Sequence, residues 1–120
     1  MKIEQKIEKD LHLVLMHHWF VMIEKGIKKE EYREKTPYWC KRFSASNCIP
    51  SYQAIKENCD NIADSCNAVQ AFPFTHIVFH DGYTSTTLRK EVVNCTCGIG
   101  NKLWGAPDHE VFIIKFKNVE

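Results

Sequence analysis

The order of apolar and polar residues predicts that the chain opens with a strand and a short helix. Residues 11–17 have the composition of a first strand, and Trp19, Met22 and Ile23 then follow at helical spacing. Gly26 comes shortly after them and is expected to end the helix, because glycine readily adopts the left-handed conformation found after helix C-termini. The chain would then reverse across the end of the helix.

A second strand and a second helix are expected directly afterwards. Residues 29–33 are predicted to be extended, which places Glu31 and Arg33 on the same face. Thr36 and Pro37 are typical of a helix N-cap and of the first helical position. The helix would carry Tyr38, Trp39 and Phe43.

The second half of the chain changes from a helical insert to strands. Residues 44–73 are predicted to be an inserted helix between loops rich in Ser, Asn and Pro. Residues 75–80, 88–97 and 111–116 are predicted strands, with a turn at Asp81-Gly82. Strands at both ends and helices early in the chain predict a mixed α/β (α+β) fold, a small β-barrel decorated by short helices.

Composition narrows the class of protein. A chain of 120 residues has room for one hydrophobic core, so residues 1–120 are interpreted as a single domain. No apolar run reaches the roughly 20 residues of a membrane-spanning helix, and the charged start is unlike a signal peptide, which predicts a cytoplasmic protein without membrane contact. The six cysteines are then expected to stay thiols. Their spacing favours no zinc site, and neither a metal nor a cofactor is expected.

Three charged residues after the expected turn have the chemistry of an acid-base or anion-binding site. Burial of Lys28 would lower its pKa and make the amine a usable base or nucleophile. Glu31 would oppose that shift by stabilising the ammonium, and Arg33 offers a planar set of donors for a phosphate or a carboxylate. The same residues stand in a mixed charge run, so a solvated surface with weak ion pairs is the alternative interpretation.

The charge balance limits the size of any nucleic-acid contact. Lys and Arg number 16 against 15 Asp and Glu, and the net charge of +1 gives no long-range attraction to a polyanion. Between Lys25 and Arg42, seven basic residues stand against three acidic ones. Such a patch can hold a few phosphates, which favours a nucleoside, a nucleotide or a short single strand.

The same segment resembles a known family. Gly26, Lys28, Glu31 and Arg33 fill the pattern Gly-x-Lys-x-x-Glu-x-Arg, which is the hallmark of the ASCH family, a branch of the PUA-like barrels. The likeness covers roughly residues 11–43 and 75–118 and leaves the insert outside. Other residues in matching order are Trp19, Phe20, Met22, Ile23, Tyr32, Tyr38 and Trp39, then residues 78–83 and 98–100, Trp104 and Gly105.

This resemblance implies a PUA-like barrel with a cleft in which Lys28, Glu31 and Arg33 bind RNA or a modified nucleoside. Two ASCH branches are enzymes, one cleaving RNA and one removing the acetyl group of N4-acetylcytidine, so a hydrolase that uses the same cleft is the alternative. In the amidohydrolase branch a threonine occupies the place of Glu31, and this chain departs from that pattern. Glu31 would instead act as a general base on water, with Lys28 or Arg33 stabilising the oxyanion.

Aromatic residues near the charged set are candidates for ligand walls, since a ring stacked on a base contributes on the order of 1–3 kcal/mol. Trp39 follows the charged set closely, and Tyr83 follows a turn, where ligand contacts are common, so both are predicted to contact the ligand. Trp19 and Phe20 are interpreted as packing residues. A third hypothesis is a protein-interaction module that binds its partner through residues 51–66 of the insert.

Overall fold

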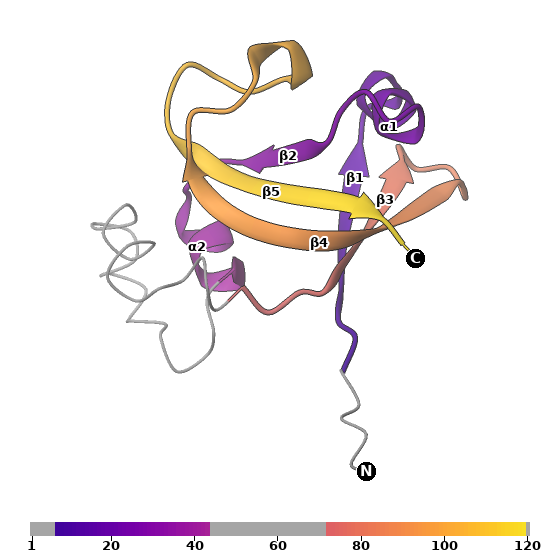
Figure 1. Ribbon diagram of the computed structural model, residues 1–120, viewed down its shortest axis with the longest axis horizontal. Coiled ribbons are helices and arrows are strands. Elements are labelled where there is room, and N and C mark those ends of the chain that lie inside the picture. The colour runs from indigo at the N-terminus through magenta and orange to yellow at the C-terminus, as the bar shows by residue number, and fades with distance from the viewer. Residues whose placement is uncertain (1–6, 44–71, 120) are drawn as a thin grey trace.

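A five-stranded sheet organises the molecule (Figure 1). The computed structural model describes residues 7–43 and 72–119. The strand order is β1-β3-β4-β5-β2, with β1 and β3 parallel and every other neighbouring pair antiparallel. In chain order the elements are β1 (Asp10–Leu15), α1 (His17–Glu24), β2 (Glu30–Arg33), α2 (Pro37–Phe43), β3 (His76–Asp81), β4 (Thr87–Gly98), the 3-10 helix η2 (Lys102–Trp104) and β5 (Val111–Asn118).

The sheet curls into a half-barrel, and β1 and β2 are its two edges (Figure 1). The longest strand, β4, contains a register shift between Val92 and Asn94. A β-bulge of this kind bends its strand and increases the local twist, which lets one strand pair with β3 at its start and β5 along most of its length. The expected mixed α+β fold with a barrel-like sheet is confirmed.

The buried apolar residues form one main core and a small second cluster. Alternate residues of β5 serve two clusters: Phe112, Ile114 and Phe116 belong to the main core, whereas Val111 and Ile113 pack in a small second cluster. This alternation is the period of two expected for a strand buried on both faces. The second cluster also contains Tyr32 and Ala106, with Trp104 packed against it.

The first strand is shorter than the sequence indicated. It ends at Leu15, and His17 already begins α1, so the prediction of a strand over residues 11–17 is wrong at its end. The physical reason is the burial pattern: alternate leucines face the core up to Leu15, after which Phe20 and Ile23 are buried at helical spacing. The prediction for Gly26 is confirmed, since its φ is 75°.

The second helix is as predicted. The backbone N–H of Trp39 donates to Thr36 Oγ1 at 3.3 Å, and Pro37 is the first helical residue. Cys40 and Phe43 face the core. Cys40 is disulfide-bonded, so the expectation that every cysteine stays a thiol is wrong at this position. The predicted insert at 44–73 lies almost wholly outside the described residues.

The connection from β4 to β5 contains a short 3-10 helix that the sequence pattern did not indicate. Asn101 caps it, accepting a hydrogen bond from the N–H of Leu103 at 2.9 Å. Gly105 ends it in the left-handed region at a φ of 96°. Within the described residues, no helix is long and apolar enough to cross a membrane.

Candidate functional site

Lys28, Glu31 and Arg33 meet at the edge strand β2. Lys28 Nζ lies 3.3 Å from Glu31 Oε1, and Arg33 Nη1 lies 3.4 Å from Glu31 Oε2. The side chains of Lys28 and Glu31 are 1% and 6% exposed, and that of Arg33 is 20% exposed. The carboxylate therefore stands between an ammonium and a guanidinium with little solvent, and the solvated charge run considered as an alternative does not describe these three residues.

The end of α1 directs Lys28 inward. The N–H groups of Ile27 and Lys28 both donate to the carbonyl of Met22, at 2.9 and 3.1 Å, while Gly26 takes the left-handed conformation. Carbonyls of the last helical turn are satisfied by this reversal, which is a common helix C-terminal arrangement. It returns the chain across the helix end, so that Lys28 precedes β2 with its side chain inside.

Three groups besides Glu31 surround the Lys28 ammonium. It donates to the carbonyl oxygen of Trp104 at 2.7 Å, and it lies 4.7 Å from the ring centroid of Tyr32 and 5.5 Å from that of Trp19. Loss of solvent lowers the pKa of Lys28 from its ordinary value, and Glu31 opposes that shift. Both the direction and the opposing influence are those expected from the sequence.

The two oxygens of Glu31 have different surroundings. Oε1 accepts the backbone N–H of Tyr32 at 3.0 Å and faces the Lys28 ammonium. Oε2 is buried and, within the part of the chain that the structure describes, has no hydrogen-bond partner. Arg33 Nη1 lies 3.4 Å from Oε2 and attracts it electrostatically. The hydrogen bond of Arg33 Nη1 goes instead to the carbonyl oxygen of Tyr32, at 2.8 Å. A buried carboxylate oxygen without a donor is unfavourable, so this atom is suited to accept an N–H or O–H from a ligand.

A hollow of about 220 Å³ opens beside these groups, and we call it the Glu31 hollow. It lies between the two edges of the sheet, because its lining includes the end of β1 as well as β2. The unclosed seam of the half-barrel therefore supplies the opening. Its lining residues are Val14, Leu15, Met16, Trp19, Glu31, Tyr32, Arg33, Trp104 and Gly105.

The aromatic walls of the Glu31 hollow differ from those predicted. Trp19, Tyr32 and Trp104 line it, so Trp19, interpreted as a packing residue, also borders the candidate site. Trp39 is outside the lining and lies beneath the guanidinium of Arg33, 5.5 Å from the ring centroid to Cζ. Tyr83 is 99% exposed on the turn after β3 and is not among the lining residues.

Two glycines let aromatic rings approach the backbone here. A Cβ on Gly105 would lie 2.9 Å from the Trp19 indole, and one on Gly100 would lie 2.4 Å from the Tyr32 ring. Tyr32 is further held by hydrogen bonds from its hydroxyl to Glu30 and from the N–H of Asn101. Its burial raises the pKa of the phenol, so the ring stays neutral. The late Gly-rich loop in the sequence is the signal that could have identified these contacts.

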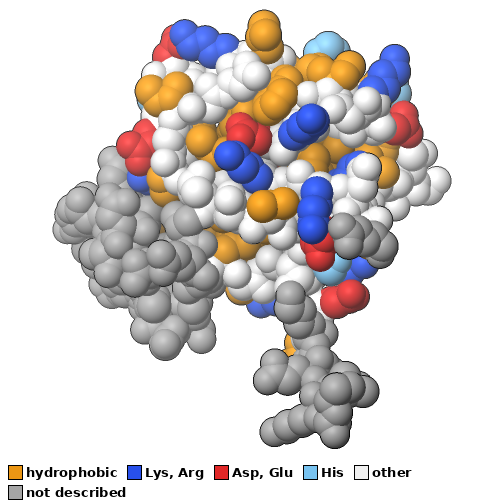
Figure 2. Space-filling view, in the orientation of Figure 1, with side chains coloured by type: hydrophobic (Ala, Val, Ile, Leu, Met, Phe, Trp, Pro, Cys, Tyr) orange, Lys and Arg blue, Asp and Glu red, His pale blue; other side chains and the backbone are white. Residues whose placement is uncertain are grey.

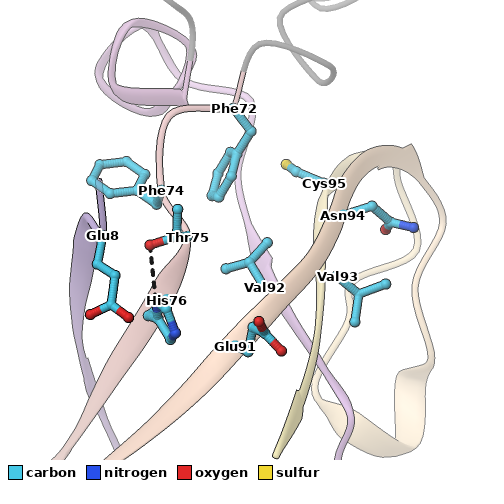
Figure 3. Close-up of a pocket in the computed structure, with 10 residues that line it drawn as sticks. All are labelled: Glu8, Phe72, Phe74, Thr75, His76, Glu91, Val92, Val93, Asn94 and Cys95. Atoms are coloured by element: carbon cyan, nitrogen blue, oxygen red, sulfur yellow. Dashed lines mark hydrogen bonds between the residues drawn. The ribbon is translucent and has the colours of Figure 1, made fainter. Parts of the chain in front are cut away.

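A larger hollow, of about 320 Å³, lies away from the Glu31 hollow, beside β3 and β4. We call it the Phe72 hollow (Figure 3). Figure 3 shows Phe72 and Phe74 on one side and Asn94 and Cys95 on the other. Thr75 Oγ1 and His76 Nδ1 are hydrogen-bonded to each other at 2.8 Å. Burial raises the pKa of the Cys95 thiol to about 12, which keeps it protonated and unreactive.

No group of three or more His, Cys, Asp or Glu side chains in residues 7–43 and 72–119 is arranged to hold a metal ion. His80, on β3, is hydrogen-bonded to His12, with His80 Nε2 2.9 Å from His12 Nδ1. No protein-family model, curated protein or solved structure matches the chain.

Proposed function

We propose that the protein binds a nucleobase in the Glu31 hollow, as part of RNA or of a free nucleoside or nucleotide. The observation that carries this proposal is the buried Glu31 Oε2, which lacks a hydrogen-bond donor and borders a hollow with aromatic walls. A base brings both missing partners, an N–H for the carboxylate and a flat face for Trp19 or Trp104. The hollow is smaller than the roughly 300–1,000 Å³ of typical drug-sized ligand sites, which suits a single base.

The arrangement of donors and acceptors fits cytosine or a modified cytosine. Glu31 Oε1 is already engaged by Tyr32 and Lys28, so one oxygen remains for the ligand. Cytosine offers its N4 amine to a carboxylate and carries acceptors next to it, which the neighbouring Arg33 guanidinium can meet. Guanine would instead present two adjacent donors to a carboxylate that has one oxygen open.

The ASCH resemblance supports the same proposal, since its three charged hallmark residues meet at the Glu31 carboxylate, which borders the Glu31 hollow. Lys28, Glu31 and Arg33 are joined through the Glu31 carboxylate, at 3.3 and 3.4 Å. We accordingly propose a PUA-like ASCH domain, with the ligand in the cleft that the family uses. In this proposal Lys28 and Trp39 position Glu31 and Arg33, which contact the ligand.

The test is the affinity of cytidine, uridine, adenosine and guanosine for the wild-type protein and for Glu31→Gln, measured by calorimetry. The amide replaces one carboxylate oxygen by an NH₂ group, so cytidine should bind at least tenfold more weakly, as loss of a charged hydrogen bond of about 1.5–3 kcal/mol implies. Glu34→Gln is the matched control, because the substitution removes the same charge and the Glu34 side chain is 53% exposed. Equal cytidine affinity in the wild type and Glu31→Gln would refute the proposal.

A hydrolase is the second candidate function, favoured by the lowered pKa of Lys28 next to the Glu31 carboxylate. Glu31 would remove a proton from water, whose oxygen would bond to the acyl carbon of N4-acetylcytidine as the C–N bond breaks and the amine takes a proton. Chromatography of N4-acetylcytidine and of a short RNA after incubation tests this. Release of cytidine by the wild type and Glu34→Gln, but not by Glu31→Gln, would establish an enzyme, whereas binding without product would identify a reader.

A further inference from the structure

A third hollow, of about 270 Å³, lies where the end of α1 meets the first part of β4 and the end of β5, and we call it the lysine hollow. Lys28, Lys29, Lys90 and Lys117 all contribute to its lining, together with Asn118. Among its described lining residues there is no Asp or Glu. Figure 2 shows several Lys and Arg side chains, with Asp and Glu side chains among them, on the face that β4 and β5 present to the viewer.

One cation of the lysine hollow, Lys90, has a neutral hydrogen-bond partner, whereas Lys28 and Lys117 each lie beside a glutamate. Lys90 is 8% exposed, and its ammonium donates to a neutral acceptor, Asn118 Oδ1. Elsewhere lysines meet carboxylates, as Lys35 meets Glu110 at 3.0 Å. Lys117 lies 3.4 Å from Glu91, at the margin of the hollow. A buried ammonium next to a neutral amide gains stability when an anion arrives, and several ammoniums in one hollow suit a phosphate.

The lysine hollow adjoins the Glu31 hollow through one side chain. Lys28 lines the lysine hollow, while its ammonium contacts Trp19, Tyr32 and the Trp104 carbonyl, all of which border the Glu31 hollow. A ligand that extends from one hollow toward the other would therefore place its base and its anionic group on either side of this lysine.

We propose that the lysine hollow binds a phosphate group of the ligand whose base occupies the Glu31 hollow. The preferred ligand is then a nucleotide or a short single strand, and a bare nucleoside binds more weakly. This inference rests on the proposed function for its base, but the phosphate site is defined by other residues. Lys29 and Lys117 are exposed and reach solvent, whereas Lys90 forms the buried cation behind them.

The experiment compares cytidine, cytidine 5′-monophosphate, cytidine 3′-monophosphate and the tetranucleotide CCCC, titrated into the wild type, Lys29→Gln, Lys117→Gln and Lys115→Gln. Lys115 is the matched control: it is on the same strand as Lys117, its side chain is also 52% exposed, and it too faces a glutamate. It does not line the lysine hollow. A mononucleotide and a single strand both supply phosphate, and the one that binds more tightly identifies which of them is the preferred ligand.

In the wild type and Lys115→Gln, at least one phosphorylated ligand should bind tenfold or more tightly than cytidine. Lys29→Gln and Lys117→Gln should each reduce this ratio severalfold while leaving cytidine affinity unchanged. The slope of log affinity against log salt for CCCC should become shallower by about 0.7 with each lysine removed. Cytidine binding with no gain from any phosphate would overturn the phosphate site and leave the proposed function standing.

A further measurement tests the phosphate site independently of base binding. Inorganic pyrophosphate is added to each protein, and the midpoint of thermal unfolding is recorded. If cytidine fails to bind but pyrophosphate stabilises the wild type and Lys115→Gln more than Lys29→Gln and Lys117→Gln, the anion site stands and the base site is overturned. Equal stabilisation of all four proteins would overturn the anion site.

Discussion

The larger of the Glu31 and Phe72 hollows is not the one that contains an unsatisfied hydrogen-bonding group. The Phe72 hollow is larger, at about 320 against 220 Å³, yet three of its polar side chains already have partners: Thr75 bonds to His76, and Glu91 pairs with Lys117. The smaller Glu31 hollow has a buried carboxylate oxygen that no donor in the described residues satisfies. Unsatisfied hydrogen-bonding capacity, rather than volume, therefore distinguishes the candidate binding site.

The strongest way to test this contrast is to remove one glutamate from each hollow. Glu31→Ala leaves the Lys28 ammonium buried without its carboxylate, which should lower the free energy of unfolding by about 3–5 kcal/mol at pH 7. Glu91→Ala removes a half-exposed ion pair and should cost less than about 1 kcal/mol. Urea denaturation, fitted for both midpoint and slope, measures both values.

A double variant checks the cause of the Glu31→Ala effect. Lys28→Met combined with Glu31→Leu leaves no unpaired charge and should regain most of the lost stability, because well-packed apolar residues often replace a buried ion pair without loss. If Glu31→Ala and Glu91→Ala cost the same, the Lys28–Glu31 pair is not the buried feature described above. If the double variant is as unstable as Glu31→Ala, packing rather than charge explains the effect.

The sequence predicted which charged residues lie together better than it predicted which aromatic rings line the Glu31 hollow. Local signals were sufficient for Gly26, Thr36 and the alternation of charged residues in β2, because a turn, a cap and a strand period depend on neighbouring residues. Trp19 was missed because its helical spacing also suits a packing residue. Its contact with the hollow depends on Gly105, which is far away in the sequence and close in space.

The aromatic predictions show the same limit of local information. Trp39 lies near the charged set as expected, but it stacks under Arg33 instead of bordering the hollow. Tyr83 follows the predicted turn, yet its ring is exposed and outside the hollow's lining. The curl of the sheet, set by the β4 bulge, determines which loops reach the seam, and no residue near Tyr83 in the sequence reports that curl.

A titration at high pH provides a second comparison, since burial disfavours the charged forms of Cys95, which lines the Phe72 hollow, and of Lys28, which contacts Glu31. The pKa of Cys95 is raised from 9.0 to about 12, so the unfolded chain loses this proton before the folded one, and stability should fall as the pH rises from 9 toward 12. Between pH 9 and 10 the contribution of Cys95 to the free energy of unfolding should fall by on the order of 1 kcal/mol. Cys95→Ala should flatten this slope in urea unfolding at each pH.

Lys28 should contribute with the opposite sign. Its pKa is lowered from 10.5, so the unfolded chain holds this proton longer, and its contribution to stability should increase with pH up to that value. Lys28→Met should therefore make the fall between pH 9 and 10 steeper, while Cys95→Ala makes it shallower. The same slope in the wild type and both variants would contradict the assignment of these shifts to burial.

The smallest expected effect comes from a substitution at the rim of the Glu31 hollow that should raise stability while weakening ligand binding. Met16 is the N-cap of α1, is 73% exposed, borders the Glu31 hollow and makes no side-chain cap hydrogen bond. Met16→Asp should cap the helix and raise the free energy of unfolding by about 0.5–1 kcal/mol. The added carboxylate at the rim should nevertheless weaken cytidine monophosphate binding severalfold, because it brings negative charge closer to an anionic ligand.

Two controls make the rim experiment specific to the Glu31 hollow. Met16→Ser supplies a cap without charge, so it should stabilise the helix and leave nucleotide affinity nearly unchanged. Val93→Asp places the same carboxylate at the Phe72 hollow, on a residue that is 53% exposed, and should not alter nucleotide binding. If Val93→Asp weakens binding as much as Met16→Asp does, general charge repulsion is responsible and the ligand cannot be assigned to the seam between β1 and β2. A loss confined to Met16→Asp would instead locate the ligand beside the unsatisfied oxygen of Glu31.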